Sequence, residues 1–201
     1  DSLAAIGAPL LEVSPKVLGT LSDTVTSQGI IAEIEIPSPV PPPRPDFVLV
    51  LDKVRDPGNA GTILRSAEAA GVRTVVLGPG SVDPWNPKVV RSGMGAHFRL
   101  TLLSLKSWPA IGELVVGSRV WLAEAQGAVP YDAVDWTARC ALVIGGEAEG
   151  VSAEARRLGT GNVAIPIAGR AESLNAAMAA TVLVFERARQ IRRTATAAFA
   201  V

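Results

Sequence analysis

The sequence predicts an α/β domain built on a parallel β-sheet with helices on both faces. From residue 47 onward, short apolar runs of strand length alternate with segments of helical spacing. The runs are apolar at successive positions, as expected for strands that are buried on both faces. The composition agrees, because 48% hydrophobic and 19% charged residues are typical of a chain that forms a core.

The predicted elements follow in order. FVLVL at residues 47–51 is the first strand, and residues 61–70 have helical spacing that ends at Gly71. The remaining expected strands are residues 74–77, 120–123, 141–144 and 163–167, and the expected helices between them are residues 108–116 and 152–158. Residues 173–193 form the longest predicted helix, which is apolar nearly all round over residues 176–185 and should be buried on several sides.

A proline-rich segment precedes this domain. Residues 37–45, PSPVPPPRP, contain six prolines in nine positions and favour an extended conformation, so we interpret them as a linker. Residues 1–36, with a strand-like stretch from Ile30 to Ile36, are fewer than the ~40 that fold unassisted. Because the chain begins at Asp1 without Met or a signal-peptide pattern, we expect a fragment or a processed form, with residues 1–36 the end of a further domain.

Composition excludes several classes of protein. The charges of the 19 basic and 19 acidic residues cancel. This excludes a strongly cationic protein that coats nucleic acid, but it does not exclude a local basic face. Aromatic residues, at 4%, are too few for a platform that stacks single-stranded bases. The apolar runs stop well short of the ~20 residues of a membrane span. We therefore expect no membrane partner.

The sequence contains one cysteine, Cys140, and one histidine, His97. They allow neither an internal disulfide nor a set of Cys/His metal ligands, so we expect no metal and a reducing, cytoplasmic location. Cys140 begins a predicted strand and is interpreted as a core thiol. No convincing Ser/His/Asp triad can be assembled around His97, which is interpreted as a structural or RNA-contacting residue.

Three segments with glycine, polar and charged residues follow predicted strands, where open parallel sheets bind ligands. In the first, residues 52–71, Asp56 begins a turn, Asn59 or Gly61 starts the next helix, and Arg65 points back toward the strand ends. A helix cap plus a surface arginine explains this segment equally well. In the second, residues 143–152, glycines flank Glu147 and allow close approach to a ligand. An ordinary turn between strand and helix is the alternative.

The third segment, residues 165–180, places Ser173 and Asn175 at the start of the apolar helix. Helix capping explains Ser173, whereas Asn175 requires a partner for its amide. Neither common nucleotide loop, G-x-G-x-x-G or G-x-x-x-x-G-K-[ST], is present, and the glycine turn that starts at Gly78 is a weak phosphate signal.

Together and in this order, the three segments resemble the motifs of the SpoU/TrmH-type RNA 2′-O-ribose methyltransferases of the SPOUT superfamily. The matching positions are Asn59, Gly61 and Arg65 in the first, Glu147 and Gly150 in the second, and Pro166, Gly169, Ser173, Leu174 and Asn175 in the third. Residues 88–100, KVVRSGMGAHFRL, are similar to a further segment of the family, and the resemblance spans residues 47–193. Ile167, Ala176 and Ala177 depart from the residues most usual there.

The resemblance implies a SPOUT methyltransferase domain over residues 46–201, with a C-terminal trefoil knot and a homodimer whose active site spans the interface. It also implies that residues 1–36 are the remnant of a small ribosomal-protein-like substrate-binding domain. The implied cofactor is S-adenosyl-L-methionine, held by Gly78, Gly145, Ile165 and Leu174, largely through backbone groups. The implied catalytic residues are Arg65, Asn59, Glu147, Ser173 and Asn175.

The expected reaction is methylation of a ribose 2′-hydroxyl in RNA, with 23S ribosomal RNA favoured and transfer RNA as the alternative. A knotted RNA-binding scaffold without catalysis is the alternative of another class. The combination of Arg65, Glu147 and Asn175 disfavours it, because a scaffold has no chemical use for all three. Base methylation by another SPOUT branch is a nearer alternative, which Asn59 and Arg65 disfavour.

Overall fold

The computed structural model describes residues 7–22, 27–124, 129–147 and 149–198, in two compact units, Asp1–Pro37 and Ser38–Val201. The first unit contains helix α1 (Pro15–Leu21), whose N-cap Ser14 accepts a hydrogen bond from the Val17 amide. The strand-like prediction for Ile30 to Ile36 is wrong: these residues form neither helix nor strand, and both end residues are more than half exposed. A strand requires a neighbouring strand for its hydrogen bonds, and the described part of this unit offers none.

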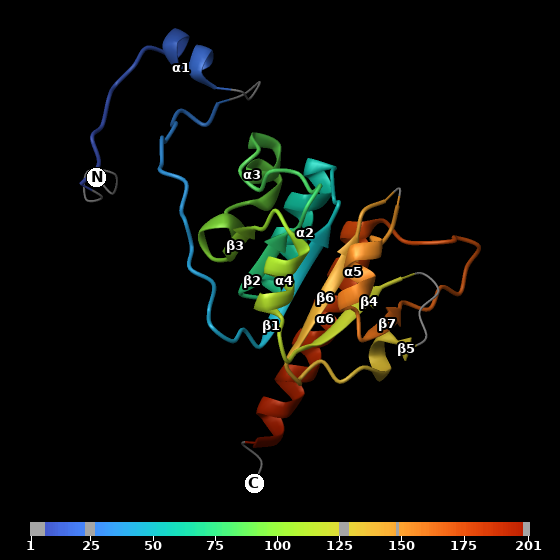
Figure 1. Cartoon of the computed structure of the whole chain (residues 1–201). Helices are drawn as coiled ribbons and strands as arrows, with labels where there is room; N and C mark the ends of the chain where they lie inside the picture. Colours follow the sequence, from blue (N-terminus) through green and yellow to red (C-terminus); the bar gives the residue numbers. More distant parts are fainter. Residues whose placement is uncertain (1–6, 23–26, 125–128, 148, 199–201) are drawn as a thin grey trace. The chain divides into compact units, whose positions relative to one another are not determined.

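The described residues of the second unit contain one parallel sheet of seven strands, in the order β3-β2-β1-β6-β4-β7-β5 (Figure 1). The strands are β1 (Phe47–Asp52), β2 (Thr74–Leu77), β3 (Thr101–Ser104), β4 (Arg119–Ala123), β5 (Val129–Pro130), β6 (Cys140–Gly145) and β7 (Gly161–Ala164). This confirms the predicted α/β class and the expected strands, with two additions. Strands β3 and β5 were not predicted: β3 begins and ends with polar residues, Thr101 and Ser104, and β5 has only two residues, so neither forms a continuous apolar run.

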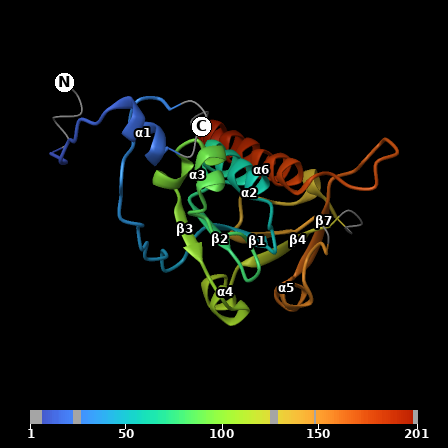
Figure 2. The ribbon, with the colours of Figure 1, turned by 90° about the horizontal axis from the view of Figure 1, so that it is seen from above.

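Helices cover both faces of the sheet (Figure 2). On one face lie α2 (Pro57–Ala69), α3 (Pro87–Gly93) and α6 (Ala176–Ala198), and on the other lie α4 (Trp108–Leu114) and α5 (Ala153–Leu158). Short 3₁₀ turns, η2 (Ala96–Phe98) and η3 (Tyr131–Ala133), complete the described elements of this unit. Successive residues of β1 alternate between two apolar cores: Leu49 belongs to the core with α2 and α6, and Val50 to the core with α4 and α5. This explains why the strand is apolar at every position.

Helix α2 begins earlier than predicted. Asp56 is its N-cap and accepts a hydrogen bond from the Asn59 amide at 2.7 Å, and Pro57 occupies the first turn. Proline suits that position because its missing N–H would have no intrahelical partner. The residues predicted as a turn are therefore the cap and the first turn of α2, and Asn59 lies within the helix.

Strand β7 and helix α6 also differ from their predicted bounds. The strand ends at Ala164 instead of residue 167, and the helix runs over Ala176–Ala198 instead of residues 173–193. Residues 165–175 consequently form a connection between β7 and α6 that contains most of the third motif (Figure 1). We find no helix among the described residues that is long and apolar enough to cross a membrane.

Candidate functional site

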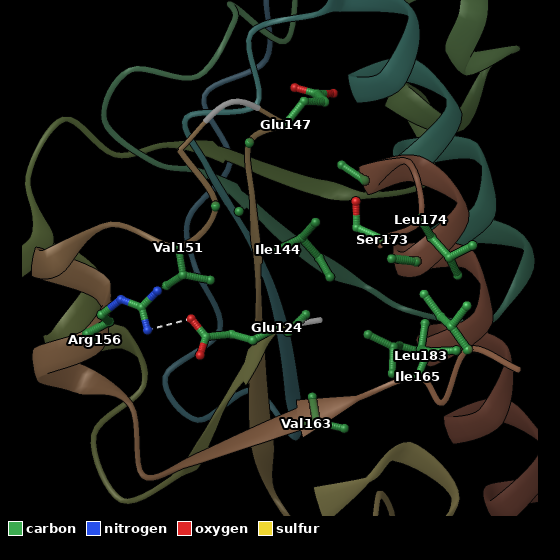
Figure 3. A pocket seen from close by; sticks show the side chains of 17 residues that line it. Glu124, Ile144, Glu147, Val151, Arg156, Val163, Ile165, Ser173, Leu174 and Leu183 are labelled. Atoms are coloured by element: carbon green, nitrogen blue, oxygen red, sulfur yellow. Dashed lines mark ion pairs between the residues drawn. The ribbon is translucent and has the colours of Figure 1, made fainter. Parts of the chain in front are cut away.

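A cavity of about 240 Å³ lies at the carboxyl ends of β4, β6 and β7, bounded by residues 165–174 and the first turns of α6 (Figure 3). This is the edge of a parallel sheet at which ligands bind. Five of the predicted site residues line it: Gly145, Glu147, Ile165, Ser173 and Leu174. Ile165, Leu174 and Leu183 gather on one side of the view in Figure 3 and form an apolar wall.

A chain of hydrogen bonds joins three predicted catalytic residues from three distant segments. The Asn59 side-chain amide donates from Nδ2 to Oε1 of Glu147. Asn59 Oδ1 in turn accepts from Nδ2 of Asn175 at 3.1 Å. With one group donating and the other accepting, the orientation of the Asn59 amide is fixed. The structure therefore brings Asn59, Glu147 and Asn175 together, as the resemblance implied.

Asn175 also caps α6, which corrects the prediction that Ser173 is the cap. Its Oδ1 accepts from the amides of Ala177 at 2.9 Å and Met178 at 3.3 Å. Because the helix begins at Ala176, Asn175 occupies the position from which a side chain reaches those amides, and Ser173 lies two residues too early. Ser173 is exposed and lines the cavity instead.

Close backbone packing fixes the loop that contains Glu147. A Cβ on Gly145 would lie 2.2 Å from the carbonyl carbon of Gly150, and one on Gly146 would lie 2.3 Å from the Lys53 carbonyl oxygen. Gly150 has a φ of +62°, which favours glycine. These glycines are therefore required for the turn itself, as well as for access to the cavity.

The same loop is held by three residues that were not selected from the sequence, Asp52, Lys53 and Arg55. The buried carboxylate of Asp52 accepts from the Ser152 amide at 2.6 Å. Glu149 forms ion pairs with Lys53 at 2.6 Å and Arg55 at 3.1 Å. The hydrogen bond from Lys53 lowers the pKa of Glu149 and raises the pKa of Lys53. An aspartate directly after a wholly apolar strand was the available sequence signal for Asp52.

Two predicted residues lie away from this cavity. Arg65 is exposed on α2, and its side chain has neither an ion pair nor a hydrogen bond with any residue that the structure describes. Gly78 follows β2 and is outside the cavity lining, and its amide donates to the Leu51 carbonyl at 2.8 Å. Its predicted contact with a cofactor stays a prediction.

A further polar residue of the cavity wall, Glu124, was not predicted from the sequence. Glu124, directly after β4, pairs through Oε1 with Arg156 Nη1 at 2.5 Å. Its Oε2 accepts from Asn162 Nδ2 at 3.1 Å. Both Glu124 and Arg156 line the cavity (Figure 3). Local sequence gives no signal for this arrangement, because the three residues come from three different elements.

His97 and Cys140 are both buried and lie outside the cavity lining. His97 is 3% exposed, and its Nε2 lies 2.8 Å from the Pro84 carbonyl oxygen. Cys140 lies in β6, where burial raises the pKa of its thiol to about 11. This confirms the interpretation of Cys140 as a core thiol. No group of three or more His, Cys, Asp or Glu side chains in the described ranges could hold a metal ion.

Comparisons with known proteins give one family. The SpoU rRNA Methylase family matches residues 46–185. The 23S rRNA (guanosine(2553)-2′-O)-methyltransferase RlmP of Bacillus subtilis is 36% identical over 174 residues, which cover 86% of this chain and 70% of that protein. The mitochondrial rRNA methyltransferase 3 of Mus musculus is 35% identical over 242 residues, covering 91% of this chain and 58% of that protein. The chain thus spans less than two thirds of that mitochondrial relative.

Solved structures of methyltransferases are similar to this chain as well. A crystal structure of an AdoMet-bound rRNA methyltransferase from Sinorhizobium meliloti has a TM-score of 0.79 and 31% identity, covering 94% of this chain and 74% of that one. The SpoU methyltransferase AviRb from Streptomyces viridochromogenes, in complex with AdoMet, has a TM-score of 0.71 and 34% identity, covering 76% of this chain and 64% of that one. The match in sequence spans the whole sheet and the loops that form the cavity, and the chain belongs to the SpoU rRNA methylase family.

Proposed function

We propose that this chain transfers a methyl group from S-adenosyl-L-methionine to a ribose 2′-hydroxyl of RNA, with 23S ribosomal RNA as the favoured substrate. The observation that supports this most directly is the hydrogen-bonded chain of Asn59, Glu147 and Asn175 beside the cavity. The names of the relatives in Bacillus subtilis and Streptomyces viridochromogenes, both 23S rRNA 2′-O-methyltransferases, favour ribosomal over transfer RNA.

The cavity suits the cofactor chemically. Its apolar wall, which includes Ile165, Leu174 and Leu183, fits an adenine ring, and the carboxylate of Glu147 can accept from hydroxyl or ammonium groups. Bound there, the cofactor would supply a methyl group on a sulfonium, which is already a good leaving group. The protein's task is then to align the ribose oxygen and to let its proton leave.

We assign the alignment of the ribose oxygen to the hydrogen-bonded chain of Asn59, Glu147 and Asn175. Asn59 is held by Glu147 and Asn175, which leaves one of its amide hydrogens for the substrate. Glu147 is exposed and has a second carboxylate oxygen with which to accept from a ribose hydroxyl. Ser173, at the cavity, can donate or accept. Arg65 is effectively always protonated, so we assign it to the phosphate and to the developing alkoxide instead of to proton removal.

The position of Arg65 supports an active site shared between two subunits. At 3.6 residues per turn, Asn59 and Arg65, six residues apart on α2, point in directions that differ by about 120°. One subunit therefore cannot easily direct both side chains at one ribose, whereas Arg65 of a second copy can complete the site. Met178 and Phe185 of α6 are 59% and 42% exposed, which is typical of a helix that packs on a partner.

The remaining proposals rest on the family resemblance. They are the trefoil knot near the C-terminus, the contact of Gly78 with the cofactor, and the origin of residues 1–36 in a substrate-binding domain. A cytoplasmic location is likewise proposed only from the single cysteine and histidine, and the curated relatives include mitochondrial proteins.

Calorimetric titration with S-adenosyl-L-methionine, together with a mass from light scattering, tests the cofactor and the dimer. We expect saturable binding with one site per subunit of a dimer. A folded dimer that binds no S-adenosyl-L-methionine would overturn the enzymatic proposal and favour the knotted scaffold.

The shared site is tested by mixing inactive variants. Arg65→Ala should abolish methyl transfer to 23S ribosomal RNA while leaving cofactor affinity unchanged, and Arg73→Ala, also exposed, is the matched control. Subunits with Arg65→Ala and subunits with Asn175→Ala, each inactive alone, should regain activity after unfolding and refolding together. Each mixed dimer then contains one intact site. Failure to regain activity, with mixed dimers shown by mass spectrometry, would contradict a shared site.

A further inference from the structure

Glu124 is an ionisable side chain in the cavity wall with no role in the chemistry above. It follows β4 directly, and its side chain is only 16% exposed. Other residues of the cavity lining, including Ala123 and Val163, are apolar. A carboxylate in such surroundings loses hydration, and this loss requires compensation from hydrogen-bonding partners.

The protein supplies part of that compensation. Arg156 pairs with Oε1 and Asn162 donates to Oε2, so that both oxygens of Glu124 are held. Each carboxylate oxygen has two lone pairs, so each retains capacity for one more donor. In Figure 3, Glu124 and Arg156 lie across the view from Ile165 and Leu174. Because Glu124 and Arg156 line the same cavity as this apolar wall, a ligand that fills the cavity can reach the carboxylate.

A purely structural role explains this arrangement poorly. The Arg156 side chain is 51% exposed, and ion pairs that solvent reaches contribute little to stability. Apolar side chains would join these elements without the cost of dehydrating a carboxylate. A charge fixed on both oxygens and open to a cavity is instead the arrangement expected of a ligand-binding group.

We propose that Glu124 is a cofactor-binding residue, whose carboxylate accepts hydrogen bonds from donor groups of S-adenosyl-L-methionine while Arg156 and Asn162 hold it in place. The donors are the ribose hydroxyls or the α-ammonium group, which present the same hydrogen-bonding chemistry. This inference rests on the proposed function, because it names a contact in the same site.

The test is calorimetric titration of the full chain and its Glu124→Gln variant, which keeps the side-chain size and removes the charge. The ligands are S-adenosylmethionine, S-adenosylhomocysteine and methylthioadenosine, which lacks the amino-acid group. Hydrogen bonds to charged groups predict that the variant binds S-adenosylmethionine about ten- to a hundredfold more weakly. Glu154→Gln, on α5 and outside the cavity lining, is the matched control and should bind like the original protein.

The ligand series identifies the donor. Weaker binding of all three ligands indicates the ribose hydroxyls, and weaker binding of only the two with an amino-acid group indicates the ammonium; either result supports the proposal. Unchanged affinity of a folded Glu124→Gln variant for all three overturns it. Failure of the original protein to bind S-adenosylmethionine would instead overturn the proposed function.

If Glu124→Gln does not fold, the Arg156→Ala variant tests the proposal instead. Its control is Arg157→Ala, because Arg157 is the exposed neighbour of Arg156 on α5. Loss of the Arg156 ion pair should leave the carboxylate less well held and weaken S-adenosylmethionine binding relative to the control. Equal affinities of the two arginine variants would then overturn the proposal.

Discussion

Asn175 has two functions that substitution can separate. Its Oδ1 caps α6 by accepting from two backbone amides, and its Nδ2 donates to Asn59. Asn175→Ala removes all three hydrogen bonds. Loss of an N-cap costs about 1 kcal/mol and loss of an exposed hydrogen bond about 0.5–1.5 kcal/mol, so we expect the free energy of unfolding to fall by about 1.5–2.5 kcal/mol. In a domain of this size that corresponds to a melting temperature lowered by about 3–10 °C.

Asn175→Asp retains the cap and removes the donor. Aspartate caps helices as well as asparagine does, and its charge is favourable at the N-terminal end of the helix dipole. We therefore expect its melting temperature to remain close to that of the original protein. The Asn59 amide, however, would then have a carboxylate on each side, Glu147 and the introduced group, and would lose its fixed orientation. Methyl transfer should be lost in Asn175→Ala and should fall in Asn175→Asp.

Thermal and urea unfolding followed by circular dichroism measure the first effect, and methyl incorporation into 23S ribosomal RNA measures the second. A fully stable Asn175→Ala variant would refute the assignment of Asn175 as the cap of α6. An Asn175→Asp variant with full activity would refute the view that donation to Asn59 positions the amide for catalysis. A matched loss of stability in both variants would mean that the cap depends on more than the Oδ1 atom.

Three further predictions concern stability. In Gly61→Ala the new Cβ would lie 1.9 Å from Ser92 Oγ and would force α2 and α3 apart. The free energy of unfolding, measured in urea, should therefore fall by about 1–3 kcal/mol. An unchanged free energy of unfolding would mean that α3 shifts freely. Asp52→Ala leaves the buried Ser152 amide without its acceptor and should cost about 1–3 kcal/mol by the same measurement. Burial raises the pKa of Cys140 from 9.0 to about 11, so the stability gained from keeping the thiol neutral is fully present below pH 9 and is lost as the pH rises toward 11. The folded protein should also resist a thiol reagent at pH 8 until urea is added, and rapid reaction without urea would contradict this.

The sequence alone was sufficient for features that depend on neighbouring residues. Apolar runs such as residues 74–77 predicted their strand correctly, because burial of a parallel strand on both faces leaves a continuous signal. The order of the three motifs also identified the family. Local reasoning was less accurate at boundaries, as at Pro57 and Asn175, because cap geometry decides which polar residue begins a helix.

What only the tertiary structure decided is which side chains meet. β6 lies beside β1 and β4, although β2 and β3 follow β1 in the chain, and this order brings Glu147 to Asn59 and Glu124 to the cavity. An apolar strand shows that it is buried but not which strand it pairs with, since all parallel neighbours offer the same backbone hydrogen bonds. The partners of Glu124 come from elements 32 and 38 residues further along the chain, so no local pattern could assign them. Strand order, set by packing of the whole domain, determines the site.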